Sequence, residues 1–301
     1  MIPTYSIVAY DFETCELGVA VQSRYFSVGS VVPWAEAGVG AIATQSFVNV
    51  SYGPKGLALL KEGFTAEEVV KRLIGEDEGR DYRQLGVVDA KGNATAYTGA
   101  KCLEWAGSKT GKGYSVQGNI LASGEVVRAM AQAYESTKGN LAERLVAALE
   151  AGERAGGDAR GRQSSALVVV KKDCGRGGYG DRLIDLRVED HQDPVGELKR
   201  LLSLHRAYYL IDEAESKFTQ GKLEEAVSHI KGALKINPGC DDAYLDLGLI
   251  YLKANKTKEA AEAFRKAIEI NPKITAVIRQ IPKLGLVDAL ICKHALEKLL
   301  S

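Results

Sequence analysis

Cysteine and histidine are scarce in this sequence of 301 residues. The five cysteines are scattered, odd in number and never arranged as Cys-x-x-Cys, which excludes a disulfide framework and a structural zinc site. The four histidines lie outside the predicted strand core, which argues against a histidine-based triad: they are His191, His205, His229 and His294. We therefore expect no metal and no cofactor, and a reducing cytoplasm is the simplest setting for the unpaired cysteines.

Long hydrophobic runs and an excess of charge of either sign are also absent. No apolar stretch reaches the length of a transmembrane helix, and no basic segment precedes an apolar core at the N-terminus, so neither a membrane span nor a secretion signal is predicted. Lys and Arg together number 39, as do Asp and Glu. This balance gives no global field to attract nucleic acid or an anionic membrane, and neither is expected as a partner.

The N-terminal segment places a hydroxyl side chain at the start of a strand. β-Branched runs at 4–10 and 17–24 flank a polar turn, which predicts a hairpin. Thr4 opens the first run, and an N-terminal nucleophile needs this arrangement because its hydroxyl attacks a carbonyl while its own α-amine serves as the base. That chemistry requires removal of Met1-Ile2-Pro3. A threonine chosen only for its β-propensity is the alternative interpretation.

Several short motifs carry a family resemblance over the first two thirds of the chain. They are Thr4-Tyr5-Ser6-Ile7-Val8-Ala9, Gly18-Val19-Ala20-Val21, Ser23-Arg24-Tyr25-Phe26, Val31-Val32-Pro33-Trp34, Ala43-Thr44-Gln45, Tyr82-Arg83-Gln84-Leu85-Gly86, Val116-Gln117-Gly118-Asn119-Ile120-Leu121 and Gly161-Arg162-Gln163-Ser164-Ser165. In this order they resemble the "domain of unknown function 1028" family, which is grouped with the Ntn-hydrolase fold. The resemblance implies a four-layer αββα sandwich and gives no substrate.

The pattern between residues 25 and 193 alternates pairs of strands with pairs of helices. It predicts strands at 31–32, 39–45, 85–89, 94–98, 114–121, 165–170 and 183–188, and helices at 53–63, 65–74, 123–135 and 140–154. Capping boxes or cap residues start the helices at Thr65, Ser123 and Asn140. Helices are thus available to cover the outer faces of two sheets, so the residues themselves predict an αββα domain over 1–193.

Strands disappear beyond Pro194, and a repeat takes their place. Ile236-Asn237-Pro238 recurs as Ile270-Asn271-Pro272, a spacing of 34 residues that is typical of tetratricopeptide repeats. We predict a linker helix at 194–205 and a helical domain at 206–301. That domain would contain two repeats, at about 207–238 and 241–272, and a capping helix within 277–300 that Pro282 could break.

The only cation among the first 54 residues is Arg24. Proteasome-type threonine hydrolases have Asp-Ser-Arg at the end of the second strand and a later Lys, whereas this chain has Gln22-Ser23-Arg24 and no Lys before Lys55. Proteasome-like tuning of the nucleophile is therefore missing. Arg24 is a candidate for stabilising an anion or binding a carboxylate, and a structural ion pair with Asp11 or Glu36 is the alternative.

Other candidate site residues lie at strand ends and in a basic loop. Gln117 and Asn119 end a strand where their amides could stabilise an oxyanion, and Thr44 and Gln45 end another strand that could line the same cleft. The loop 156–165 is rich in glycine and carries Arg162 and Ser164, which we expect to hold an anionic group of the substrate. Ordinary turn or loop hydrogen bonding is the alternative for each.

Two functional hypotheses follow. In the first, Thr4 is the nucleophile of an N-terminal-nucleophile hydrolase that cleaves a small amide or peptide bond, Gln117 and Asn119 stabilise the oxyanion, and substrate is bound by Arg24, Thr44, Gln45, Arg162 and Ser164. In the second, the sandwich is a non-catalytic ligand-binding or scaffold domain. Its helical repeats would then recruit a protein partner or mediate self-association. Gln22 and the missing Lys favour the second hypothesis.

Overall fold

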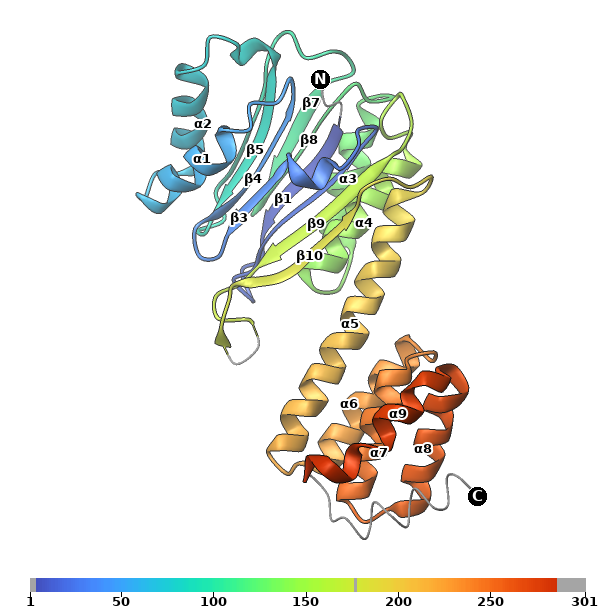
Figure 1. The fold of residues 1–301 in the computed structure, drawn as a ribbon. Coiled ribbons are helices and arrows are strands. Elements are labelled where there is room, and N and C mark those ends of the chain that lie inside the picture. The colour runs from blue at the N-terminus through green and yellow to red at the C-terminus, as the bar shows by residue number, and fades with distance from the viewer. Residues whose placement is uncertain (1–3, 176–177, 286–301) are drawn as a thin grey trace. The chain divides into compact units, whose positions relative to one another are not determined.

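The computed structural model describes residues 4–175 and 178–285. The chain divides into two compact units, Met1–Leu201 and Leu202–Ser301, and each is treated separately below. Figure 1 shows the strands gathered in the first unit, while the second is helical. Among the described residues, no helix combines the length and apolarity needed to cross a membrane.

Two antiparallel sheets form the centre of the first unit. The larger has the strand order β10 (Arg182–Val188), β9 (Ser164–Val170), β2 (Leu17–Ser23), β1 (Thr4–Tyr10), β8 (Tyr114–Asn119) and β7 (Gly107–Gly111). The smaller has the order β3 (Pro33–Glu36), β4 (Gly40–Ser46), β5 (Arg83–Asp89) and β6 (Ala94–Thr98). The predicted hairpin is confirmed as β1 and β2, and β1 lies between β2 and β8 within the larger sheet.

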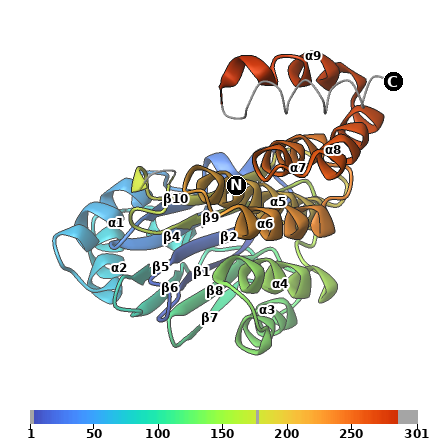
Figure 2. The same cartoon turned by 90° about the horizontal axis from the view of Figure 1, so that it is seen from below.

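Helices cover the outer faces of both sheets, as Figures 1 and 2 show. Helices α1 (Tyr52–Lys61) and α2 (Ala66–Gly75) pack on the smaller sheet, and α3 (Glu125–Ser136) and α4 (Leu141–Arg154) pack on the larger. The predicted four-layer αββα arrangement is thus confirmed. Thr65 and Asn140 cap α2 and α4 as predicted, and both belong to capping boxes, because each cap side chain accepts a backbone N–H while a glutamate side chain accepts in return. The predicted cap Ser123 is not the N-cap of α3: that position is Gly124, and Ser123 Oγ accepts from the N–H of Glu125.

The strands differ from the prediction at two places. Val31-Val32 is not a strand: a 3₁₀ turn covers Val28–Ser30, and β3 begins only at Pro33. Val32 is nevertheless fully buried, so its apolar character reflects the core rather than a strand. Strand β7 was not predicted, because its sequence Gly-Ser-Lys-Thr-Gly is polar and rich in glycine and pairs with one neighbour only.

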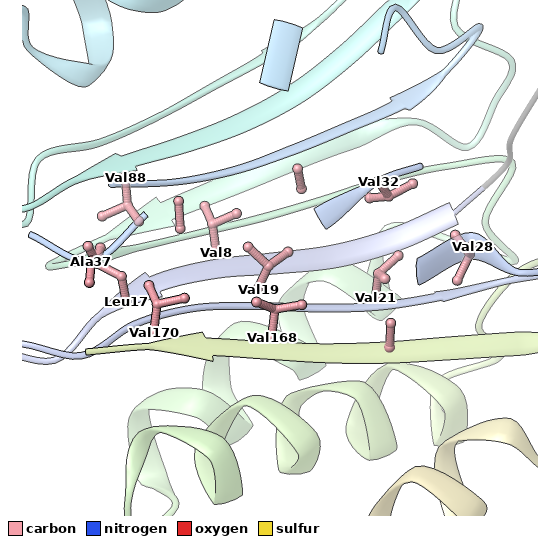
Figure 3. Close-up of a cluster of buried hydrophobic side chains, with 13 residues drawn as sticks. Val8, Leu17, Val19, Val21, Val28, Val32, Ala37, Val88, Val168 and Val170 are labelled. Carbon is pink, nitrogen blue, oxygen red and sulfur yellow. The ribbon is translucent and has the colours of Figure 1, made fainter. Parts of the chain in front are cut away.

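The space between the sheets is apolar over one half of its length. Val8, Val19 and Val168 lie in a buried cluster with side chains of β3, β4 and β5 (Figure 3). Since neighbouring side chains of a strand point to opposite faces, Thr4 and Ser6 share the inward face with Val8. Tyr5 lies on the outer face, where its hydroxyl donates to Glu153 of α4 at 2.5 Å. The alternation of side chains along β1 therefore places the Thr4 side chain between the sheets.

Helix α5 runs without interruption from Pro194 to Thr219, whereas the sequence prediction ended a linker helix at 205. No glycine or proline occurs between Glu197 and Gln220, so nothing in the sequence stops the helix earlier. The C-terminal half of α5 supplies the first helix of the repeat array.

The second unit continues with α6 (Leu223–Ile236), α7 (Asp241–Lys253) and α8 (Thr257–Ile270). Close packing depends on small residues: a Cβ on Gly248 of α7 would lie 2.3 Å from the buried ring of Phe264 in α8. Helix α9 (Thr275–Ile278) and a 3₁₀ turn (Ile281–Leu284) that contains Pro282 follow. Most of the predicted capping helix falls outside the described residues.

One carboxyl group of this unit is poorly solvated. Asp246 of α7 lies beside the apolar side chains of Phe218, Leu249 and Ile250. No described Lys or Arg forms an ion pair with it. Burial raises its pKa to about 7, and the negative charges of Glu215, Asp242 and Asp212 contribute. Because the folded-state pKa exceeds the unfolded-state value, the contribution of Asp246 to stability is most favourable at acidic pH and is lost as the pH rises from about 3.8 to about 7.

We expect Asp246→Asn to stabilise the protein at pH 8 by on the order of 1 kcal/mol, since partial solvent access reduces the effect of the full pKa shift. At pH 4 the same change should have little effect, because the carboxyl is protonated in the folded state. Thermal unfolding at both pH values measures this. Glu262→Gln, at an exposed position of α8 that does not contribute to the pKa shift of Asp246, is the control. An equal gain at pH 4 and pH 8 would contradict the assignment.

Candidate functional site

The other half of the space between the sheets is polar and buried. It lies where β1 begins and where β2, β4 and β8 end. Thr4 pairs in register with Ser23 on one side and with Asn119 on the other. Its hydroxyl donates to Ser23 Oγ at 3.1 Å, and all three residues are fully buried. The sequence prediction did not include Ser23 as a site residue.

Gln84 of β5 determines how this cluster is oriented. Its Nε2 donates to the carbonyl oxygens of Gly118 and Gly107, at 2.8 and 3.3 Å. Since a backbone carbonyl can only accept, the nitrogen of Gln84 must face the larger sheet and its Oε1 must act as an acceptor. Gln84 Oε1 then accepts from Asn119 Nδ2 at 2.9 Å and from Gln45 Nε2 at 2.8 Å.

A second group of hydrogen bonds lies deeper between the sheets. Ser6 Oγ donates to Gln45 Oε1 at 2.7 Å and accepts from Gln117 Nε2 at 2.7 Å. Ser115 Oγ donates to Gln117 Oε1 at 2.8 Å. Both ends of the Gln117 amide are therefore engaged, so it supports the cluster and does not face an open site. Gln45 Nε2 also donates to the carbonyl oxygen of Thr4 at 3.3 Å.

Two buried amides retain unsatisfied atoms within the described residues. Asn119 Oδ1 has no hydrogen-bond partner there, although its Nδ2 is held by Gln84. Neither the oxygen nor the nitrogen of the Gln22 side chain has one, and both residues are fully buried. Buried acceptors without a donor are rare and costly. Because Asn119 pairs with Thr4 across the strands, its unsatisfied oxygen indicates that a donor could bind near Thr4.

The cluster carries no formal charge. Ser6, Gln45, Gln84, Gln117 and Asn119 form hydrogen bonds only to hydroxyl, amide and backbone groups in the described part of the chain. On the outer face of β1, burial and the negative charge of Glu153 hold the pKa of the Tyr5 hydroxyl well above its usual value. Within the described residues, the amides and hydroxyls of the cluster are too weakly basic to take a proton from a nucleophile.

The predicted cations meet at a different place. Arg24 and Arg162 line one surface depression of about 730 Å³, together with Gln163, His191 and Asp193. Arg162 donates to Glu153 and lies 3.7 Å from a carboxylate oxygen of Asp193. The guanidinium of Arg24 forms no ion pair within the described ranges. The alternative of a structural ion pair with Asp11 or Glu36 is not observed: Arg144 pairs with Asp11, and Lys61 pairs with Glu36.

Two other predicted site residues have local partners. Ser164 Oγ donates to the carbonyl of Tyr25 and accepts from the backbone N–H of Val28 at 3.0 Å, so it fixes the segment after β2. Thr44 lies on the face of β4 opposite to Gln45, and its hydroxyl donates to the carbonyl of Asn49 at 3.2 Å. The predicted site therefore divides in two: Thr4, Gln45, Gln117 and Asn119 lie between the sheets, while Arg24 and Arg162 line the depression.

Ser6, Gln84 and Ser115 belong to the buried cluster and were not predicted. The alternation of side chains along each strand could have identified them, because each lies an even number of residues from another inward-facing residue of its strand. For metals, no cluster of His, Cys, Asp and Glu within 4–175 and 178–285 has ligand geometry.

Replacing Gln84 by Leu tests the orienting role of this amide. We expect the free energy of unfolding to fall by about 2–4 kcal/mol, because the Asn119 side chain then loses its one partner among the described residues and Gln45 loses its best acceptor, while both stay buried. Denaturant unfolding monitored by circular dichroism measures this. Gln163→Leu is the matched control, since in the described part of the chain the Gln163 side chain donates to the exposed Asp190 alone, and it should change stability by less than about 0.5 kcal/mol. Equal effects of the two changes would contradict the orienting role.

Comparisons with known proteins agree with this architecture. A family model described as "Family of unknown function (DUF1028)" matches residues 4–198, and a tetratricopeptide-repeat model matches residues 211–273. The crystal structure of protein SPO2555 from Silicibacter pomeroyi, of the DUF1028 family, is similar with a TM-score of 0.61 and 32% sequence identity. The match covers 67% of this chain and 85% of that one. No curated protein matches. The chain therefore belongs to the DUF1028 family of unknown function and carries tetratricopeptide repeats after the family domain.

Proposed function

We propose that this protein hydrolyses a small amide or peptide bond with Thr4 as its N-terminal nucleophile, once the three preceding residues have been removed. The Thr4 hydroxyl attacks the carbonyl carbon and transfers its proton to the α-amine of the same residue. The amine then protonates the leaving nitrogen. Water hydrolyses the resulting ester with the amine again as base, which frees Thr4.

The observation that carries this proposal is the unsatisfied acceptor beside Thr4. Asn119 Oδ1 is buried and has no donor within the described residues, and Asn119 pairs in register with Thr4. An α-amine at Thr4 offers more N–H donors than a peptide nitrogen, and one of them would satisfy this oxygen and orient the amine. The neutral cluster leaves the amine as the available base, and burial favours its uncharged form.

Stabilisation of the oxyanion would come from the same amides. Asn119 Nδ2 carries two N–H bonds, and Gln84 Oε1 accepts one of them. The second is available for the oxyanion that forms when Thr4 attacks. Gln117 would contribute indirectly by holding Ser6 and Gln45 in place. Arg24, whose guanidinium is unpaired in the described part of the chain, would orient an anionic part of the substrate that extends beyond the strand ends.

The repeats support a second function, the binding of a protein partner. The tetratricopeptide model covers residues 211–273, and Phe218, Leu249 and Ile250 line a recess of about 250 Å³ next to Asp246. Stacked repeats form extended concave surfaces, and proteins of this kind bind their partners there. If the sandwich domain is not catalytic, this binding function would be the main one, and the repeats would act as a scaffold or in self-association.

The catalytic proposal is tested with protein that begins at Thr4, made by proteolytic removal of an N-terminal tag. We expect turnover of members of a fluorogenic amide library, and at least about a thousandfold loss in Thr4→Ala because nucleophile and base geometry act as a unit. Thr4→Ser should retain activity. Thr14→Ala, which changes a half-buried turn residue whose hydroxyl donates to Asp11, is the control. Equal turnover by Thr4→Ala on every amide that is cleaved would reject the proposal.

A further inference from the structure

Large apolar side chains are exposed around the end of the sandwich where Thr4 lies. We define the apolar rim as the six residues Tyr25, Phe26, Phe47, Tyr82, Leu103 and Trp105. Their exposed fractions range from 37% for Trp105 to 62% for Phe26. Single exposed hydrophobic residues are ordinary, but a set that surrounds one site indicates a surface used for binding.

Backbone hydrogen bonds place each rim segment at this end. Phe47 follows the last residue of β4 and Tyr82 precedes the first residue of β5; their ring centroids lie 5.5 Å apart, and the Phe47 N–H donates to the Tyr82 carbonyl. The carbonyls of Leu103 and Trp105 accept from Ile120 and Leu121, which directly follow Asn119 at the end of β8.

The remaining rim residues, Tyr25 and Phe26, follow the end of β2, where Ser23 pairs with Thr4. Gln45 and Gln84 connect the ends of the two sheets by donating to the carbonyls of Thr4 and Gly118. Strand ends from both sheets, together with the segments that bear the rim, therefore converge on Thr4 and Asn119.

We infer that the apolar rim binds an aromatic or large aliphatic side chain of the substrate, next to the amide that Thr4 attacks. This inference rests on the proposed function, which makes the ligand an amide. The rim segments adjoin the strand ends that carry the buried amide cluster, so a ligand bound to the rim would lie close to Asn119. An N-acylated aromatic or branched aliphatic amino-acid amide has both parts: a peptide group for the amides and an apolar group for the rim. A second copy of the chain is the competing occupant.

Trp105 gives a direct signal of binding. The chain has two tryptophans, and Trp34 lies in β3 with its Nε1 donating to the Val31 carbonyl, so Trp34→Phe leaves emission from the rim alone. In a Thr4→Ala, Trp34→Phe protein, made both at full length and starting at residue 4, no probe is cleaved. We expect saturable changes in emission with N-acetyl-phenylalaninamide and N-acetyl-leucinamide. N-acetyl-glycinamide should bind at least about tenfold more weakly.

Variants of the rim complete the test. Phe26→Ser and Phe47→Ser should each weaken binding of N-acetyl-phenylalaninamide by about tenfold, whereas Tyr179→Ser should not, although Tyr179 is 85% exposed. Equal affinity for the phenylalanine and glycine probes, or no saturable signal in either chain length, would overturn the inference. A dimer that Phe26→Ser dissociates in analytical ultracentrifugation would assign the rim to a second copy instead. The two proposals can fail separately, because binding is measured in the inactive Thr4→Ala protein. If that protein binds the probes but protein that begins with Thr4 cleaves no amide, the hydrolase proposal is rejected and the assignment of the rim stands.

Discussion

The side-chain amide of Gln84 is the interaction on which the candidate site depends. Two backbone carbonyls of the larger sheet fix its nitrogen, and this leaves its oxygen as the acceptor for Asn119 and Gln45. The orientation of Asn119 follows, and so does the unsatisfied oxygen beside Thr4. A single glutamine between two sheets thus decides which groups a ligand or an amine at Thr4 would meet.

A polar interior of this kind reduces stability unless its groups form hydrogen bonds within the protein or with a ligand. The half of the space around Val8 and Val19 gains stability by burying apolar area, whereas the half around Thr4 replaces this gain with hydrogen bonds of small net value. Functional sites are where sequences depart from the pattern that stability alone would favour. The apolar rim outside and the amide cluster inside are opposite to the usual arrangement of surface and core.

Much of the architecture could be predicted from the sequence, since the hairpin of β1 and β2, the caps at Thr65 and Asn140 and the period of 34 residues are local signals. The grouping of site residues was harder. Strand period alone would have placed Gln45 and Thr44 on opposite faces, but only the pairing of two sheets shows that Gln84 meets Asn119. Arg24 and Arg162 were predicted to act together, and they do line one depression, but Thr4 is not part of it.

The most direct measurement is the intact mass of the protein purified from its native host. The account predicts a loss equal to Met1-Ile2-Pro3, because only then does Thr4 carry an α-amine that can act as the base and satisfy Asn119 Oδ1. Protein that retains Ile2 and Pro3 in full would have a peptide nitrogen at this position. That result would contradict catalysis by Thr4 and would leave ligand and partner binding as the function to pursue.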